Sequence, residues 1–427
     1  MNSRDSAAPA PRAAEISSLI RSGRVEQARR ACRNAIDAGR GDASMRVLLA
    51  ACEQRLGNPG AAVSALEQAA RESADPLLLQ HVADAMLKLS AFDEAAAVIA
   101  RLDTSRPESV LLQARCRWGQ GEYAAAVEQL GALSDIVPGW PLLAVSHARM
   151  RINLDEPDRA LAILDRALAE HPRDPSLLHQ KALLLVSMHG CAAARAWAVQ
   201  RAAHAQLDRL IDALSALTGG DAPADHPGEG WAGFRALLAE AGEDTAWYGD
   251  NVALLKAALA RAPAEGAVVE CGVHHGRTVN LLAGWVPERR VHGFDSFHGL
   301  PEAWSEREPA GSYSAGGRMP PTRANVELAA GWFAETLPAF AGALSEPIAL
   351  LHVDCDLYSS TVEVLSALGP LLADRAVVVF DEYTGYPGWR EHEYRAWREY
   401  RERTGTAATL VGAQLLGQSA AFEVAVA

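Results

Sequence analysis

The fold of this chain is decided by the stretch Leu350-Leu351-His352-Val353-Asp354-Cys355-Asp356, which is followed by a helical segment and then by Val377-Val378-Val379-Phe380-Asp381-Glu382. Both stretches are short apolar runs that end in paired carboxylates, a pattern typical of buried parallel strands. If the two strands are neighbours, their acids meet at one edge of a sheet and repel one another. We therefore expect a hard divalent cation there, because oxygen ligands suit magnesium, calcium or manganese.

The length and composition of the chain limit the class of protein. At 427 residues it is too long for one ordinary core, which predicts two domains. The net charge of −13 argues against nucleic acid as a partner. The six cysteines are scattered without a Cys-x-x-Cys pair, which favours a reducing cytoplasm over disulfides or a zinc site. Neither a signal peptide nor a membrane span is predicted, so we expect a cytoplasmic protein.

The first half of the chain repeats a turn followed by an Ala-centred helix. The helices share an alanine at the same place, at Ala28, Ala62, Ala95, Ala126 and Ala160. A second small residue follows seven positions later, at Ala35, Ala69 and Ala167. Prolines interpreted as helix stops lie near the repeat boundaries, at Pro107, Pro138 and Pro172. The spacing of about 34 residues is the tetratricopeptide period.

Residues 12–217 therefore resemble a tetratricopeptide array, an all-α solenoid of antiparallel helix pairs. We interpret Cys191 to Ala194 as part of a degenerate sixth unit and Arg201 to Leu217 as a capping helix. Such an array presents a concave surface, which indicates a protein or carrier partner. There are two alternatives to partner binding. The array could be a dimerisation module, which would make the protein a homo-oligomer, or it could only stabilise the chain.

A Gly-, Pro- and Asp-rich linker at 218–228 separates the array from a second domain at 229–427. Two helical segments follow the linker, Trp231 to Ala241 and Asn251 to Ala262. Strand and helix patterns then alternate to the end of the chain. This alternation predicts a doubly wound, mostly parallel sheet with helices on both faces.

A glycine loop follows the first strand of this sheet. The strand runs into Glu270, and the loop contains Gly272 and Gly276, where the backbone can turn sharply and approach a ligand. The next strand ends at Asp295-Ser296, where an acid is placed to bind ribose hydroxyls. The Glu-x-Gly-x-x-x-Gly spacing differs from a dinucleotide loop and resembles the S-adenosylmethionine loop of class I methyltransferases. These five residues are the predicted cofactor-binding set.

Four motifs in order make the resemblance specific: Phe294-Asp295-Ser296-Phe297-His298-Gly299-Leu300-Pro301, Gly331 to Pro338, His352 to Thr361 and Phe380 to Tyr383. Together they resemble the macrocin O-methyltransferase family, whose members include metal-dependent enzymes that methylate sugar hydroxyls of antibiotics. The resemblance implies a Rossmann-like sheet, S-adenosylmethionine, magnesium and a small sugar-containing acceptor. It also implies that Asp354, Asp381 and Glu382 bind the metal, although antibiotic-sugar members more often have Asp at the last position.

The residues also suggest catalytic roles. A metal-bound sugar hydroxyl has a lowered pKa, and Asp354 is placed both to bind the metal and to take the proton. His352, two residues earlier on the same strand, is a second catalytic candidate; its alternative is a packed histidine that is hydrogen-bonded within the sheet. Asp356 either binds substrate or orients a metal ligand without binding the metal itself. The alternative is that it caps the following helix. We expect acceptor contacts in the segment after Tyr383, which includes Glu393.

Two other functions fit parts of the sequence. Asp354-Cys355-Asp356 is an Asp-x-Asp that also suits a metal-dependent glycosyltransferase holding a nucleotide-sugar diphosphate. The Glu270 to Gly276 loop, Asp295 and the second acid pair argue against it. A non-enzymatic adaptor with a retired methyltransferase domain is the further alternative. The complete acid set disfavours this reading, because such close carboxylates repel one another without a cation.

Overall fold

A computed structural model describes residues 13–137, 139–201, 207–220, 224–305 and 308–425. Pro138, residues 202–206 of the predicted capping helix and residues 221–223 of the predicted linker lie outside the described residues. The described residues form two compact units: one comprises those within 1–133 and 298–314, and the other comprises those within 134–297 and 315–427. The domain limits 12–217, 218–228 and 229–427 stay predictions.

Helices make up the first half of the chain, as predicted. Their bounds are α1 Ala13–Arg21, α2 Val25–Asp37, α3 Ala43–Arg55, α4 Pro59–Glu72, α5 Pro76–Lys88, α6 Phe92–Ile99, α7 Pro107–Gly119, α8 Tyr123–Ile136, α9 Pro141–Ile152 and α10 Pro157–Glu170. The five alanines that define the repeat are all fully buried, at Ala28, Ala62, Ala95, Ala126 and Ala160. Small side chains at these positions let the paired helices approach closely, which confirms the tetratricopeptide-like interpretation.

The turns between paired helices share one backbone feature. Each has a residue with positive φ at the same place in the repeat: Gly23, Gly57, Ser90, Gly121 and Asp155. The interpretation of Pro107 as a helix stop is wrong, because this proline is the first residue of α7. Proline suits the first position of a helix, where its missing N–H would have no helical partner and its φ is already helical. Pro172 does lie just after the end of α10.

α11 (Pro175–Val199) ends the array and is interrupted at Gly190, where the backbone has φ 81° and ψ 170°. The break matches the predicted degenerate sixth unit, and α12 (Asp208–Leu217) and α13 (Glu229–Glu240) follow. Among the described helices, α11 alone is long and apolar enough to span a membrane by length and composition. Core helices share these properties, and α11 packs into one cluster with Leu210 of α12 and Trp231 of α13.

The second half contains one eight-stranded sheet. Its strands are β1 Ala246–Tyr248, β2 Ala267–Cys271, β3 Val291–Asp295, β4 Val326–Ala330, β5 Ile348–Val353, β6 Leu372–Phe380, β7 Ala407–Gln414 and β8 Ala420–Ala425. Their order is β1-β7-β8-β6-β5-β2-β3-β4, and only β8 runs antiparallel to its neighbours. The chain extends from β2 to β3 and β4 on one side and from β5 to β6 on the other. The strand order therefore switches between β2 and β5, where open sheets of this kind bind ligands.

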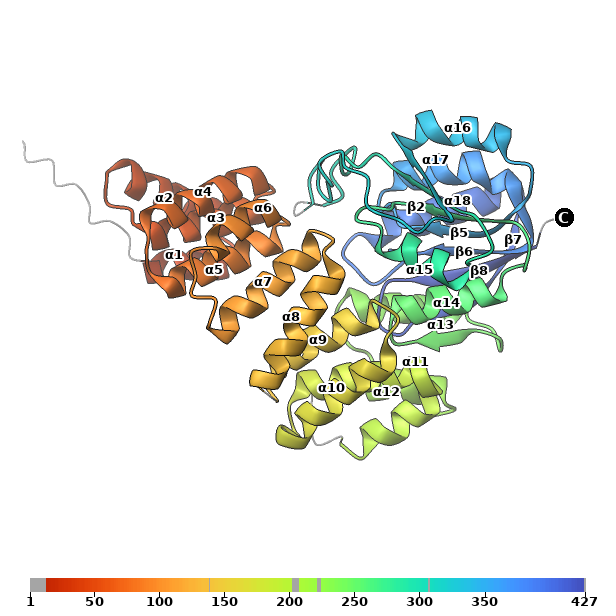
Figure 1. Cartoon of the computed structure of the whole chain (residues 1–427), viewed down its shortest axis with the longest axis horizontal. Coiled ribbons are helices and arrows are strands. Elements are labelled where there is room, and N and C mark those ends of the chain that lie inside the picture. The colour runs from red at the N-terminus through yellow and green to blue at the C-terminus, as the bar shows by residue number, and fades with distance from the viewer. Residues whose placement is uncertain (1–12, 138, 202–206, 221–223, 306–307, 426–427) are drawn as a thin grey trace, which may run out of the picture. The chain divides into compact units, whose positions relative to one another are not determined.

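Helices cover both faces of the sheet (Figure 1). α14 (Asn251–Arg261) and α15 (Arg277–Trp285) lie on one face, and α16 (Phe333–Ala343), α17 (Tyr358–Leu368) and α18 (Glu393–Thr404) lie on the other. Successive residues of β5 face opposite layers: Leu350 packs in the α14–α15 core and Leu351 in the α17–α18 core. The predicted doubly wound architecture is thus confirmed.

α11 also packs against the start of α14. A Cβ added at Gly249 would lie 1.8 Å from the Leu183 carbonyl oxygen, so only glycine fits at this crossing. Ser187 Oγ accepts a hydrogen bond from the Gly249 N–H (2.9 Å) and donates one to Asp250 Oδ2 (2.6 Å). Asp250 in turn caps α14 by accepting from the Ala253 N–H. The last helix of the array therefore fixes the position at which α14 begins.

Candidate active site

The predicted acids meet at the carboxyl edge of the sheet, beside the switch between β2 and β5. Asp354 directly follows β5, and its N–H donates to the Cys271 carbonyl of β2 (2.9 Å). Asp381 directly follows β6, and its N–H donates to the Val353 carbonyl of β5 (3.0 Å). The backbone of both residues thus continues the hydrogen bonding of the sheet. This gives their side chains a rigid support.

The three predicted metal ligands lie together. One oxygen from each of Asp354, Asp381 and Glu382 lies within 4.8 Å of the others. Glu382 Oε2 is buried and has no hydrogen-bond partner among the described residues. Burial and then the neighbouring Asp381 carboxylate raise the pKa of Asp354 and of Glu382 well above their ordinary values. An all-oxygen group with an unpaired buried oxygen fits a hard divalent cation.

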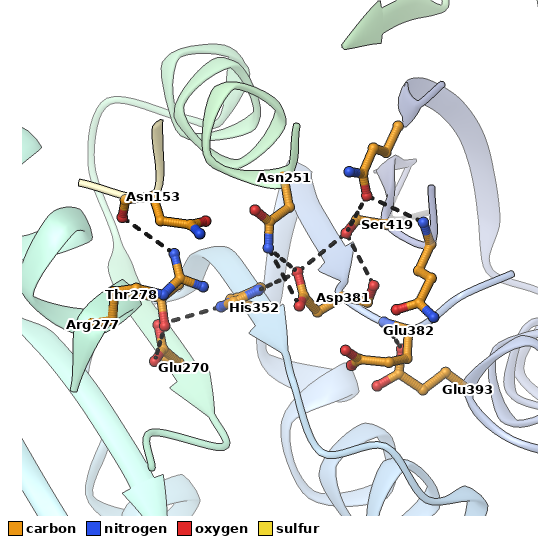
Figure 2. A network of polar contacts seen from close by, with 12 residues as sticks. Asn153, Asn251, Glu270, Arg277, Thr278, His352, Asp381, Glu382, Glu393 and Ser419 are labelled. Atoms are coloured by element: carbon orange, nitrogen blue, oxygen red, sulfur yellow. Dashed lines mark hydrogen bonds and ion pairs between the residues drawn. The ribbon is translucent and has the colours of Figure 1, made fainter. Parts of the chain in front are cut away.

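His352 lies beneath this group and is fully buried (Figure 2). Its Nδ1 is 3.3 Å from Glu270 Oε2, and its Nε2 is 3.9 Å from Asp381 Oδ1. Burial alone would lower the pKa of His352, but Asp381 and Glu270 raise it to about 10. Both ring nitrogens face protein carboxylates, an arrangement that agrees with the packed-histidine alternative. The imidazolium balances negative charge at the sheet edge.

Glu270, a predicted cofactor ligand, is also fully buried. Its Oε1 accepts a hydrogen bond from Thr278 Oγ1 (2.8 Å), while its Oε2 faces His352. Glu270 and His352 are direct partners in the β2–β5 pairing, so the register of the sheet creates this contact. The Glu270 carboxyl group therefore connects Thr278, in the helix after the glycine loop, to His352 beneath the predicted metal ligands. Contact of Glu270 with a cofactor stays a prediction.

The glycine loop has the backbone that the sequence predicts. Gly272 and Gly276 have φ values of 101° and 77°. A Cβ at Gly272 would lie 1.6 Å from the Asp354 carbonyl oxygen, so the loop and the metal edge touch through this glycine. Glycine at position 272 is therefore required by the packing of the loop against Asp354, and contact of the loop with a cofactor stays a prediction.

Asp295 organises the same loop from the end of β3. Its Oδ2 accepts hydrogen bonds from the N–H groups of Val273 (2.8 Å) and His274 (2.7 Å). Its Oδ1 accepts a hydrogen bond from the Phe297 N–H (2.6 Å). Ser296, the residue between Asp295 and Phe297, is half-buried. Asp295 thus holds the loop in shape, and ribose binding by Asp295 and Ser296 stays a prediction.

Asn251, the first residue of α14, was missed in the sequence. Its Nδ2 donates to Asp381 Oδ1 at 3.1 Å, and Ser419 Oγ donates to the same oxygen at 3.2 Å (Figure 2). Burial opposes ionisation of Asp381, but His352 and Asn251 lower its pKa to about 2. An amide at the start of a helix is too common a feature to have indicated this contact.

Glu393, the first residue of α18, is a further acid that the sequence indicated only as part of a segment. It is fully buried, and its Oε2 accepts from the Glu382 N–H at 3.0 Å (Figure 2). Its Oε1 is buried and lacks a hydrogen-bond partner among the described residues. Asp356 has a φ of 63°, and Leu357, not Asp356, caps α17. Asp356 thus lies one residue before the N-cap position, and its role stays a prediction.

Known proteins resemble both halves of the chain. Residues 269–383 match a family model described as a methyltransferase domain. A mycinamicin III 3''-O-methyltransferase from Micromonospora griseorubida is 29% identical over 34% of this chain and 64% of its own length. A demethyldecarbamoylnovobiocin O-methyltransferase from Streptomyces niveus is 30% identical over 31% of this chain and 58% of its own. The chain thus spans less than two thirds of either relative.

A solved tetratricopeptide repeat protein from Parabacteroides merdae is 14% identical, with a TM-score of 0.39, over 49% of this chain and 83% of its own. The match to a methyltransferase domain lies within the sheet of the second half, and the first half is a tetratricopeptide-like helical repeat.

Proposed function

We propose that this chain is a metal-dependent O-methyltransferase that moves a methyl group from S-adenosylmethionine to a hydroxyl of a sugar or glycosylated natural product. The observation that carries the proposal is the group Asp354, Asp381 and Glu382, whose oxygens lie within 4.8 Å beside the glycine loop. The methyltransferase-domain match over residues 269–383 supports the reaction class. Two relatives named as O-methyltransferases of mycinamicin III and demethyldecarbamoylnovobiocin support the acceptor class.

The residues divide the work between two places. Gly272 and Gly276 supply the positive-φ turns of the loop that we propose holds the methyl donor, while Asp295 keeps the loop in shape. Asp354, Asp381 and Glu382 are the proposed ligands of a divalent cation, with Mg²⁺ the ion that their hard oxygens suit. A bound cation supplies a lowered pKa at an acceptor hydroxyl and fixes its orientation.

Asp354 is the proposed base that receives the hydroxyl proton. The Asp354 carbonyl oxygen lies against Gly272, and the Asp354 N–H donates to the Cys271 carbonyl. The backbone of Asp354 is therefore in direct contact with the proposed donor loop. Proton removal by a positioned carboxylate typically contributes about 10²- to 10⁴-fold to the rate. His352 is the proposed positioning residue beneath Asp381, since its ring is enclosed by protein carboxylates.

Calorimetry on the full-length protein tests the proposal. Titration with S-adenosylmethionine in the presence of Mg²⁺ should show one binding site, and titration with nucleotide sugars should show none. The reverse pattern would indicate the glycosyltransferase reading of Asp354-Cys355-Asp356. Binding of neither ligand would reject the enzymatic proposal and leave the adaptor reading.

A further inference from the structure

Arg277 is a cation at the carboxyl edge that forms no ion pair within the described residues. It is the first residue of α15, directly after Gly276 of the glycine loop, and is half-buried. Within the described part of the chain, no carboxylate lies within the 4.0 Å that defines an ion pair with its guanidinium. Its one hydrogen bond there goes from Nη1 to the Asn153 carbonyl oxygen at 3.5 Å (Figure 2). Most of its five N–H groups therefore remain available to a ligand.

This arginine contrasts with the other charged groups at the same edge. His352 is enclosed by Glu270 and Asp381. Asp354, Asp381 and Glu382 lie together at the ends of β5 and β6, so carboxylates outnumber the described cations at this edge. An anion entering this region is repelled unless it meets a guanidinium, which binds carboxylates strongly through paired hydrogen bonds.

The strand order suggests which anion that is. Asp295 ends β3 and marks the expected ribose side of the loop, while Asp354 ends β5 and marks the side of methyl transfer. β2 lies between these strands, and its loop leads directly into Arg277. A methyl donor laid across the three strands would place its amino-acid end at this loop, and that end carries a carboxylate.

We propose that Arg277 binds the α-carboxylate of S-adenosylmethionine, so that recognition of the donor's amino-acid end depends on this guanidinium. The inference rests on the proposed methyltransferase function and deepens it by assigning a residue outside the expected cofactor set.

The helix pair α9–α10 of the array contacts both ends of the helix that begins with Arg277. α15 contacts the turn between α9 and α10 at both of its ends: Arg277 donates to the Asn153 carbonyl, and Trp285 Nε1 donates to Asp155 Oδ2 at 2.9 Å. Lys256 of α14 also donates to Asp155 Oδ2 at 2.6 Å. Asp155 has a positive φ at a turn position where three of the other repeats have glycine. The turn thus gives α15 a fixed support.

The test compares two donors that differ only in the carboxylate. Calorimetry on the full-length protein measures binding of S-adenosylmethionine and of decarboxylated S-adenosylmethionine, each with Mg²⁺. The parent protein should bind S-adenosylmethionine about 10- to 100-fold more tightly, as expected for a charge-assisted contact. Arg277→Gln should weaken only S-adenosylmethionine, and Arg277→Lys should weaken it less.

Arg290→Gln is the matched control, because exposed Arg290 precedes β3 at the opposite edge of the sheet and pairs with Glu327. It should leave both affinities unchanged. Equal weakening of the two donors by Arg277→Gln and Arg277→Lys, or no change for either, would overturn the assignment. A change in the KM of the acceptor with donor binding intact would overturn it as well. If the parent protein binds neither donor, the proposed function itself fails.

Discussion

Two buried histidines lie in opposite electrostatic surroundings. In the array, His147 Nε2 accepts from Arg151 Nε at 3.2 Å, its Nδ1 lies 3.2 Å from Ser134 Oγ, and Arg151 also pairs with Glu156. At the sheet edge, both nitrogens of His352 face carboxylates.

Burial and then Arg151 lower the pKa of His147 to about 4, while carboxylates raise that of His352 to about 10. Around His147, the ring is therefore neutral and both of its nitrogens have protein partners. The edge group contains a cationic ring and still leaves Glu382 Oε2 and Glu393 Oε1 unpaired among the described residues. Unpaired buried polar atoms are costly, so they indicate where a ligand is expected. The comparison thus separates a group whose polar atoms are all satisfied within the fold from one that is proposed to serve a reaction.

The largest expected effect comes from the edge. Asp354→Asn should lower the methyl-transfer rate about 10³-fold, since it removes both a metal ligand and the proposed base. S-adenosylmethionine affinity should change little. Steady-state kinetics and calorimetry measure the two effects, with exposed Asp374→Asn at the other end of β6 as the control. A loss of less than about tenfold would remove Asp354 from the chemistry.

Stability measurements on both histidines sharpen the contrast. His352→Gln should destabilise the protein by about 3–5 kcal/mol, because the imidazole that lies between the buried Glu270 and Asp381 side chains is lost. His147→Gln should cost only about 1–2 kcal/mol, since it replaces one neutral hydrogen-bonding group by another. Urea unfolding at neutral pH gives both values. Equal losses of unfolding free energy in the two variants would contradict the proposed difference in charge between the surroundings of His147 and His352.

The array histidine also predicts a pH dependence. Because the folded-state pKa of His147 lies below its unfolded value of about 6.5, its contribution to stability is present above pH 6.5. That contribution should be lost as the pH falls towards about 4, by about 2–3 kcal/mol. Arg151 and Arg166 hold the pKa down, and Asp135 and Glu156 oppose them. His147→Gln should remove this part of the acid sensitivity in urea unfolding between pH 7 and pH 4; an unchanged slope contradicts the assignment.

The smallest effect is expected at Asn251, which joins the metal edge to α14. Asn251→Ala should weaken Mn²⁺ binding about tenfold, because residues that orient a metal ligand typically contribute 10- to 100-fold to affinity. Electron paramagnetic resonance measures free Mn²⁺ directly. Asn280→Ala is the control, since its amide contacts backbone carbonyls of Gly276 and Pro321 and not the acids. Identical Mn²⁺ affinities in the two variants would show that Asn251 has no positioning role.

The sequence carries the features that depend on local order. The alanines of the repeat are periodic, and the acids at Asp354 and Asp381 directly end apolar runs, so both the array and the convergence of acids could be predicted. Contacts between distant segments could not. Asn251 reaches Asp381 across 130 positions, and Ser187 reaches Asp250 across 63.

The orientation of buried side chains was equally hidden. Glu270 and Asp295 were both found as acids at strand ends, but only the packing shows that one faces His352 and the other faces loop amides. Pro107 shows that a proline next to a helix does not reveal by itself which end it marks.

Mn²⁺ binding by electron paramagnetic resonance tests the central claim most directly, with the full-length protein compared with the Asp354→Asn, Asp381→Asn double variant. The parent protein should bind Mn²⁺ at one site from which Mg²⁺ displaces it, and the double variant should lose that site while its circular dichroism is unchanged. Binding that persists in the double variant, or a parent protein that binds no Mn²⁺, would contradict the account.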